Sequence, residues 1–149
     1  MVVLLPGISE IVKSLEEGYC ALVFRKIKFP KGIQKENWVN QTENIIKNVI
    51  GKISLEDNIY FIFGENQELL DVGKASSKNK DIRNRLRKHL IYCSKGTSSK
   101  LTNIKNYIVD EQHQMIYIAT LRIEPEEYYQ MAESFYITRY SPKWNSRVD

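Results

Sequence analysis

The sequence predicts an α+β fold, in which a small antiparallel sheet of three core strands is flanked by helices. Two apolar runs, 59–63 and 68–72, are separated by a short polar turn, which is the pattern of an antiparallel hairpin. A third run, 114–123, alternates between two sets of side chains, as a strand does. Segments of helical period lie between and after these strands, so the order from residue 58 onward is β-β-α-α-β-α.

Residues 1–57 precede the hairpin and are predicted to form an N-terminal extension that packs on the core. Residues 9–17 have aliphatic side chains at helical spacing, and residues 19–29 have the pattern of a partly buried strand. Residues 35–50 carry a second apolar stripe of helical period, which ends at Gly51. The pattern leaves open whether this extension recognises DNA, dimerises or extends the sheet.

Residues 58–149 form the second predicted region, in which three helices follow the hairpin. The strongest helical pattern runs over residues 81–93, and a second helix is predicted over residues 98–109. Pro125, with acidic neighbours near the positive end of the helix dipole, starts a last helix that ends near Arg139.

The composition is that of a globular protein outside the membrane. Hydrophobic residues make up 42% of the chain and charged residues 27%, which excludes a disordered chain. No apolar stretch approaches the roughly 20 residues needed to span a bilayer. Cys20 and Cys93 are far apart and lack metal-binding spacing, so we expect reduced, packed thiols in a cytoplasmic protein.

The charges of the chain are unevenly distributed. Of the 22 basic and 18 acidic residues, ten basic residues and one acidic residue, Asp81, lie between Val72 and Lys105, which leaves 12 basic and 17 acidic residues elsewhere. A basic segment on an otherwise acidic chain indicates a localised site for a polyanion such as DNA. The alternative is a solvated helix face that has no partner.

The helix predicted over residues 81–93 carries most of the candidate chemistry. At 100° per residue, Arg85 and His89 flank the apolar stripe that starts at Ile82, and both lie on the same side of it. There they can meet a phosphate, or else form a packed histidine and an arginine paired with a glutamate. Other basic side chains of this helix and of the preceding loop are predicted to attract DNA phosphates from solvent: Lys78, Lys80, Arg83, Arg87 and Lys88.

Arg85 and His89 belong to a series of short motifs and single residues between about residues 58 and 145. In chain order the series is Ile59-Tyr60, Val72-Gly73-Lys74-Ala75, Arg85, His89, Glu133 and Pro142-Lys143-Trp144-Asn145. This series resembles the GIY-YIG nuclease family. The Ile-Tyr pair matches the first signature of the family, and the Val-Gly-Lys-Ala run matches the end of the second. The arginine-to-histidine spacing, the helical glutamate and the terminal Pro-x-Trp-Asn also match.

The resemblance implies a role for each matched polar residue. Tyr60 would be the general base, and its phenol would need positive charge from Lys74 and Arg85 to ionise. Arg85 would also stabilise charge on the scissile phosphate, and Glu133 would hold one Mg²⁺ or Mn²⁺. His89 would orient a phosphate or a water.

Asn145 would help to fix the geometry of this site, and Asp71 is the main departure from the family pattern. The family usually has a second tyrosine where this chain has Asp71. That carboxylate can bind metal or water, pair with Lys74, or discourage ionisation of Tyr60 and repel phosphate. We expect Lys74, beside the lost phenol, to take over part of its role.

The sequence therefore predicts a metal-dependent DNA endonuclease of the restriction, homing, repair or defence type. Cleavage of both strands from one small site would favour a homodimer. A DNA-binding module of the same fold that has lost cleavage is the first alternative. A protein-interaction domain whose basic helix meets an acidic partner is the second.

Overall fold

The computed structural model describes most of the chain. The described ranges are 2–4, 24–75, 81–92, 103–124 and 129–145. The predicted helix over residues 9–17, Cys20 and Cys93 lie outside these ranges, as do Pro125 and the first half of the helix predicted over residues 98–109.

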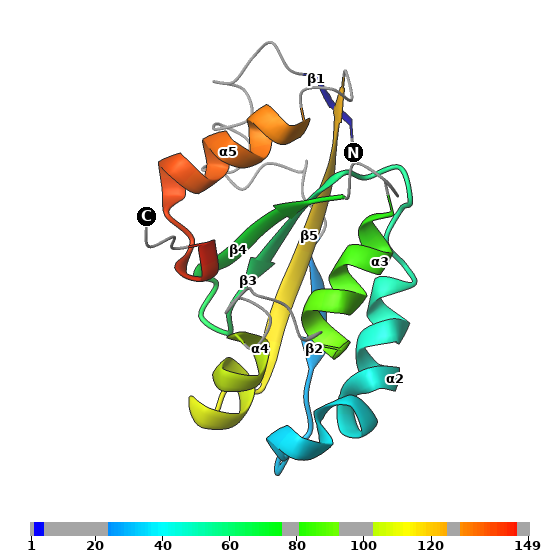
Figure 1. Cartoon of the computed structure of the whole chain (residues 1–149), viewed down its shortest axis with the longest axis vertical. Coiled ribbons are helices and arrows are strands. Elements are labelled where there is room, and N and C mark those ends of the chain that lie inside the picture. The colour runs from blue at the N-terminus through cyan, green and yellow to red at the C-terminus, as the bar shows by residue number, and fades with distance from the viewer. Residues whose placement is uncertain (1, 5–23, 76–80, 93–102, 125–128, 146–149) are drawn as a thin grey trace.

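Within the described residues the sheet has five strands, two more than the three predicted for its core (Figure 1). They are β1 (Val2–Leu4), β2 (Arg25–Lys28), β3 (Ile59–Phe63), β4 (Leu69–Lys74) and β5 (Met115–Glu124). The long β5 pairs with β3 along one edge, and with β2 and then β1 along the other, while β4 pairs with the far side of β3. Only the β1 pairing is parallel among the described strands. The three predicted strands are β3, β4 and β5, and β2 extends the sheet that they form.

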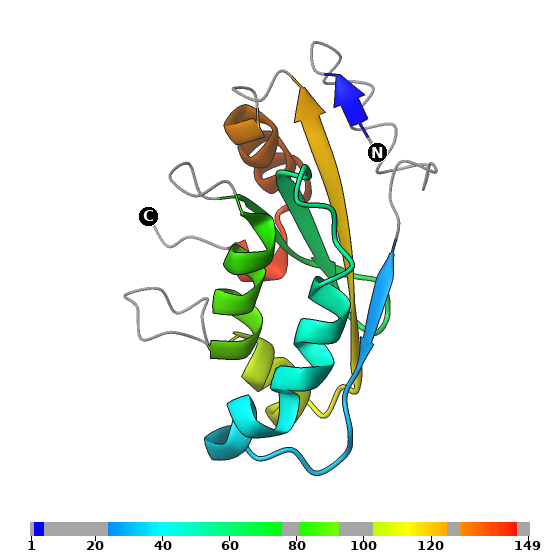
Figure 2. The same cartoon turned by 90° about the vertical axis from the view of Figure 1, so that its right-hand side faces the viewer.

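The helices lie on both faces of the sheet. In chain order they are a 3-10 turn (Lys35–Asn37), α2 (Trp38–Ile50), α3 (Ile82–Arg87), α4 (Asn103–Lys105), α5 (Tyr129–Tyr140) and a 3-10 turn (Lys143–Asn145). π-helical turns, Lys88–Tyr92 and Asn106–Asp110, directly follow α3 and α4. Figure 1 shows α5 on one side of the sheet and α2 and α3 on the other, and Figure 2 shows α2 and α3 side by side. The α+β class is thus confirmed.

The basic helix begins at its predicted residue. The Asp81 carboxylate accepts hydrogen bonds from the backbone amides of Arg83 (3.0 Å) and Asn84 (3.2 Å), two groups that a helix start leaves without helical partners. The helix then changes character, because the five residues from Lys88 to Tyr92 form a π turn rather than a continuation of α3. A π turn changes the direction of the side chains that follow it.

Each face of the sheet has its own apolar core. The face under α2 and α3 buries one large cluster, which includes Ile27 of β2, Trp38 of α2 and Leu86 of α3. The Trp38 indole donates a hydrogen bond to the carbonyl of Leu90 (2.8 Å), which fixes α2 against the basic helix. The face under α5 buries a second, smaller cluster around Tyr136. Described residues on both sides of residue 57 contribute to the first cluster.

Two asparagine side chains pair with backbone as a strand residue would. The Asn58 amide donates to the carbonyl of Ile123 (3.0 Å) and accepts from its N–H (2.8 Å). The Asn145 amide donates to the carbonyl of Val72 (3.0 Å) and accepts from its N–H (2.7 Å). Both side chains are buried.

No helix in the described part of the chain has the length and apolar character needed to cross a membrane.

Candidate active site

Tyr60 lies at the centre of the candidate site, on the sheet face that α2 and α3 cover. It is 0% exposed, and its hydroxyl donates a hydrogen bond to Asp71 Oδ2 at 3.3 Å. Gly73 is directly opposite Tyr60 in the β3–β4 register, and a Cβ at Gly73 would overlap the Tyr60 ring. The second signature, which ends in Val72-Gly73, therefore contains the glycine that makes room for the tyrosine of the first signature, Tyr60.

Charged side chains from three elements converge on the Tyr60 hydroxyl. Burial is the main reason that the pKa of Tyr60 is raised well above its ordinary value, and the negative charge of Asp71 raises it further. The charge of Arg85 on α3 lowers this pKa, while that of Glu133 on α5 raises it. The energy of such an interaction falls as the distance between the charges grows. Tyr60 is thus hydrogen-bonded to Asp71, and its hydroxyl is within the influence of the charges of Arg85 and Glu133.

The net direction of the Tyr60 pKa is the opposite of what the predicted general base requires. Lys74 supplies none of the positive charge expected of it, because it pairs with Ile59 in the register and so lies on the other face of the sheet. Its ammonium group is 5.5 Å from the centre of the Tyr129 ring on α5. Only the guanidinium of Arg85 favours the ionised phenol, and burial outweighs it.

Arg85 and His89 differ in exposure, although the sequence places them one turn apart on one side of the helix. Arg85 is exposed to solvent, so its guanidinium is accessible to an incoming phosphate. His89 is buried, with its ring centroid 6.3 Å from that of Tyr60. At 100° per residue His89 lies only ~20° from Ile82, closer to the middle of the apolar stripe than Arg85, so its burial fits the helical pattern. It lies in the π turn Lys88–Tyr92.

Asn145 acts on the site through the backbone of β4. Its two hydrogen bonds hold Val72, which lies between Asp71 and Gly73 in the chain. One amide thus fixes the backbone between Asp71, which accepts the Tyr60 hydrogen bond, and Gly73, which makes room for the Tyr60 ring. The expected role in site geometry fits this position.

The predicted phosphate-binding residues have different environments. Lys78 and Lys80 lie outside the described residues. Arg83 was expected to face solvent, but it is half-buried and its Nε donates a hydrogen bond to the carbonyl of Ile53 at 2.7 Å. It therefore anchors the helix to the segment after α2.

The other two cations of this helix also differ from each other. The Arg87 Nη2 lies 4.0 Å from Asp81 Oδ2, and its side chain is half-buried. Lys88 is exposed. Lys88 and Arg85 are thus the accessible cations of the predicted set within the described residues.

The carboxylates of the site set a limit on how a metal can bind. The described residues contain no group of three His, Cys, Asp or Glu side chains that could hold a metal ion. Mg²⁺ often binds through one or two carboxylates together with waters and substrate phosphates. Glu133 is half-buried and its charge acts on Tyr60, which fits a hydrated ion shared with the substrate and does not fit an ion held by protein ligands alone.

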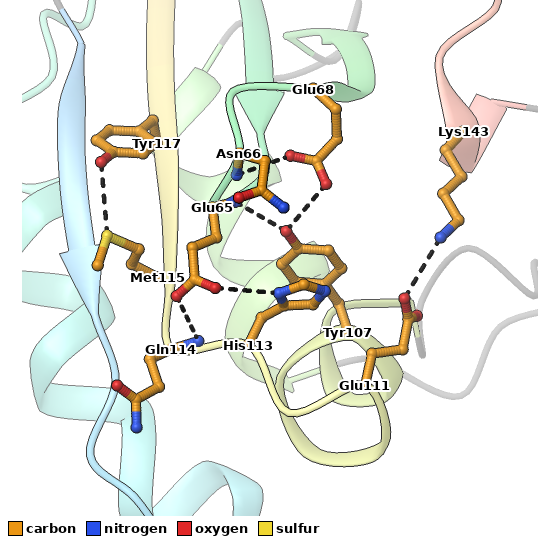
Figure 3. Close-up of polar contacts among 10 residues, drawn as sticks. All are labelled: Glu65, Asn66, Glu68, Tyr107, Glu111, His113, Gln114, Met115, Tyr117 and Lys143. Atoms are coloured by element: carbon orange, nitrogen blue, oxygen red, sulfur yellow. Dashed lines mark hydrogen bonds and ion pairs between the residues drawn. The ribbon is translucent and has the colours of Figure 1, made fainter.

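Sequence reasoning missed a second polar cluster, at the β3–β4 turn (Figure 3). The Tyr107 hydroxyl accepts from the amide of Glu65 (2.8 Å) and donates to Glu68 Oε2 (3.2 Å). His113 stacks on the Tyr107 ring at 4.0 Å, and its Nδ1 is 3.2 Å from Glu65 Oε2. The available signal was the pair of glutamates that flank the polar turn after Gly64.

Comparisons of the chain with protein-family models, with curated proteins and with solved structures found no match. The resemblance to the GIY-YIG family therefore rests on the order and the placement of the residues themselves.

Proposed function

We propose that this protein is a metal-dependent DNA endonuclease that hydrolyses phosphodiester bonds. The observation that best supports this proposal is the convergence of Arg85, Glu133 and the Tyr60–Asp71 pair from different elements at one place. An accessible guanidinium beside two carboxylates combines a phosphate-binding group with a potential metal ligand, which phosphodiester hydrolysis requires.

Arg85 binds and stabilises the scissile phosphate in this proposal. It is the exposed cation at the candidate site within the described residues, and its planar fork can donate two parallel hydrogen bonds to phosphate oxygens. Those bonds become stronger as negative charge develops on the phosphate in the transition state. Lys88, exposed and three residues further along the chain, adds sequence-independent attraction for DNA.

Glu133 would hold Mg²⁺ or Mn²⁺ through its carboxylate. Such an ion, when bound, polarises the phosphate and neutralises charge on the leaving oxygen. Glu133 lies on α5, whereas Arg85 lies on α3, so Arg85 and an ion held by Glu133 would approach the phosphate group from opposite sides of the sheet edge. This arrangement fixes the orientation of the scissile bond.

In this proposal Tyr60 and Asp71 have proton-transfer roles that differ from those predicted from the sequence. Because burial and the neighbouring carboxylates raise the pKa of Tyr60, its hydroxyl keeps its proton and acts as a donor. Its hydrogen bond orients Asp71. In this proposal the carboxylate, rather than the phenol, accepts the proton from the attacking water.

A second candidate function is DNA binding without cleavage, and burial of the same pair favours it. Tyr60 and Asp71 are almost completely inaccessible to solvent, at 0% and 1% exposure. A water molecule would need access to this pair for hydrolysis to proceed. If the pair stays closed when DNA binds, Arg85 and Lys88 would still bind phosphates.

A plasmid-cleavage assay with Mg²⁺ or Mn²⁺ tests the proposal. We expect Arg85→Ala and Glu133→Gln each to lower cleavage at least a hundredfold, about the loss of one preorganised stabilising group. Glu133→Gln should still retard DNA in a gel, since it removes no cation. Lys52→Ala and Glu36→Gln change exposed residues away from the site and serve as matched controls.

Three other outcomes would change the conclusion. Normal cleavage by both site variants would show that the site is assigned to the wrong residues. Salt-dependent DNA binding without cleavage by the wild type would support the second candidate. No binding to DNA at low salt would leave a protein-interaction domain as the better description.

A further inference from the structure

The sheet face under α5 continues beyond the helix into a part that holds aromatic and basic side chains. Residues directly opposite in an antiparallel pair share a face. Lys26 of β2 is opposite Tyr117 of β5, which is opposite Phe63 of β3, so the three side chains form one row across three strands. Lys28 follows two residues after Lys26 on the same face.

Phe24 adds a third aromatic ring to this surface. It precedes β2, its side chain is 50% exposed, and its ring packs edge-on against Phe63 with centroids 5.2 Å apart. Phe24, Phe63, Gln67 and Tyr117 line a hollow of about 320 Å³. That volume lies within the ~300–1,000 Å³ range of ligand-binding clefts. The rings are thus arranged around an open recess.

The charge of this surface is positive in the part of the chain that the structure describes. Lys26 and Lys28 are both exposed. The two carboxylates of the adjacent β3–β4 turn interact with residues outside this surface: Glu65 pairs with His113, and Glu68 accepts a hydrogen bond from Tyr107. Figure 3 shows the Tyr117 ring and the Glu65–His113 pair on different sides of β5.

We propose that this surface, the Phe24 face (Phe24, Lys26, Lys28, Phe63 and Tyr117), binds single-stranded nucleic acid. Unpaired bases would stack on the rings, and the lysines would contact the phosphates. Duplex DNA fits this surface less well, because its bases are already stacked on each other. A second copy of the chain also fits less well, because pairing two such faces would bring their lysines together.

The Phe24 face and the candidate active site lie on different faces of the sheet. Tyr60 belongs to the core under α2 and α3, whereas Phe63 packs with the core under α5. The inference rests on the proposed function for one point only, which is that the bound polymer is a nucleic acid. A protein with both sites could hold an unpaired strand on one face while the candidate active site acts on a nearby segment.

Fluorescence anisotropy with a labelled oligothymidine of about 12 nucleotides tests this inference in the absence of metal. We expect Phe24→Ala and Tyr117→Ala each to weaken binding about tenfold, the effect of one lost stacking contact. Phe24→Tyr should keep the wild-type affinity. Lys26→Ala and Lys28→Ala should each reduce the slope of log affinity against log salt by about 0.7.

Met131→Ala is the matched control, since Met131 is equally exposed (52%) but lies on α5. It should bind the oligonucleotide like the wild type. Circular dichroism and thermal unfolding would verify that each variant folds. Phe24→Ala should also retain plasmid cleavage, which separates this inference from the proposed function.

Either of two results would overturn the inference while leaving the cleavage proposal intact. The first is unchanged oligonucleotide affinity in folded Phe24→Ala and Tyr117→Ala variants. The second is a wild-type dimer that Phe24→Ala converts to a monomer in sedimentation analysis, which would assign the face to a second copy of the chain. Failure of plasmid cleavage with intact oligonucleotide binding would instead reject the nuclease and keep the inference.

Discussion

Tyr60 and Tyr107 are two buried tyrosines, each with its hydroxyl hydrogen-bonded to a carboxylate. The distances are nearly equal, at 3.3 Å from Tyr60 to Asp71 and 3.2 Å from Tyr107 to Glu68. Burial is the main cause of a raised pKa in both. Each ring or hydroxyl also lies against a glycine, Gly73 or Gly64, which leaves room for it.

The two sites differ in what else converges on the hydroxyl. Arg85 and Glu133 act on Tyr60 from separate helices, while the Tyr107 hydroxyl receives the backbone amide of Glu65 and joins a turn to the end of a helix. A tyrosine–carboxylate pair alone is therefore weak evidence of catalysis. Two carboxylates act on each hydroxyl, Asp71 and Glu133 on Tyr60 and Glu68 and Glu65 on Tyr107. The accessible guanidinium of Arg85 is therefore what distinguishes the candidate active site from the structural contact.

Substitution of the two glycines should give the largest contrast. Gly73→Ala would push a methyl group into the ring of Tyr60, which the core holds, and should lower the free energy of unfolding by about 3 kcal/mol. Gly64→Ala meets the carboxylate of Glu68 and the Tyr107 hydroxyl, which can move, and should cost about 1 kcal/mol. Urea denaturation would measure both, and equal losses would contradict the contrast.

Removal of each hydroxyl should give a smaller contrast. Tyr60→Phe takes a hydrogen-bond donor from the buried Asp71 and should lower the free energy of unfolding by about 2 kcal/mol. Tyr107→Phe should lower it by about 1 kcal/mol, because water can replace the donor that Glu68 loses. Only Tyr60→Phe should slow plasmid cleavage. A cleavage defect in Tyr107→Phe would show that the two sites are not functionally distinct.

Alkaline titration should give the smallest effect. The pKa of Tyr107 is raised to about 12, so the folded state holds this proton more tightly than the unfolded chain, whose phenols ionise near pH ~10. The resulting stability is fully present below pH ~10 and is lost as the pH rises toward about 12. Across this pH window, the free energy of unfolding should fall less steeply for Tyr107→Phe than for the wild type.

Local patterns predicted the order of elements well. The hairpin, the helix that precedes it and the long strand β5 are confirmed, because each depends on a hydrophobic period that a short segment carries. The start of the basic helix at Asp81 is also confirmed. Of the predicted site residues, His89 has its ring centroid 6.3 Å from that of Tyr60, and the charges of Arg85 and Glu133 act on the Tyr60 hydroxyl.

The remaining features depend on register and on contacts between distant segments. Lys74 follows Gly73, and strand alternation places it away from Tyr60 only once Gly73 is known to face that ring. The π turn that contains His89 has no sequence signature. The cluster of Tyr107 with the β3–β4 turn joins residues about forty positions apart.

Asn145 has a consequence for how this protein behaves at high concentration. Among the described strands β4 is the last of its sheet, and an open edge strand offers backbone groups to which a strand of another molecule can add. The Asn145 amide occupies both backbone groups of Val72 near the middle of that edge. Loss of this side chain would therefore favour aggregation, and a fall in the yield of soluble protein should precede any effect on chemistry.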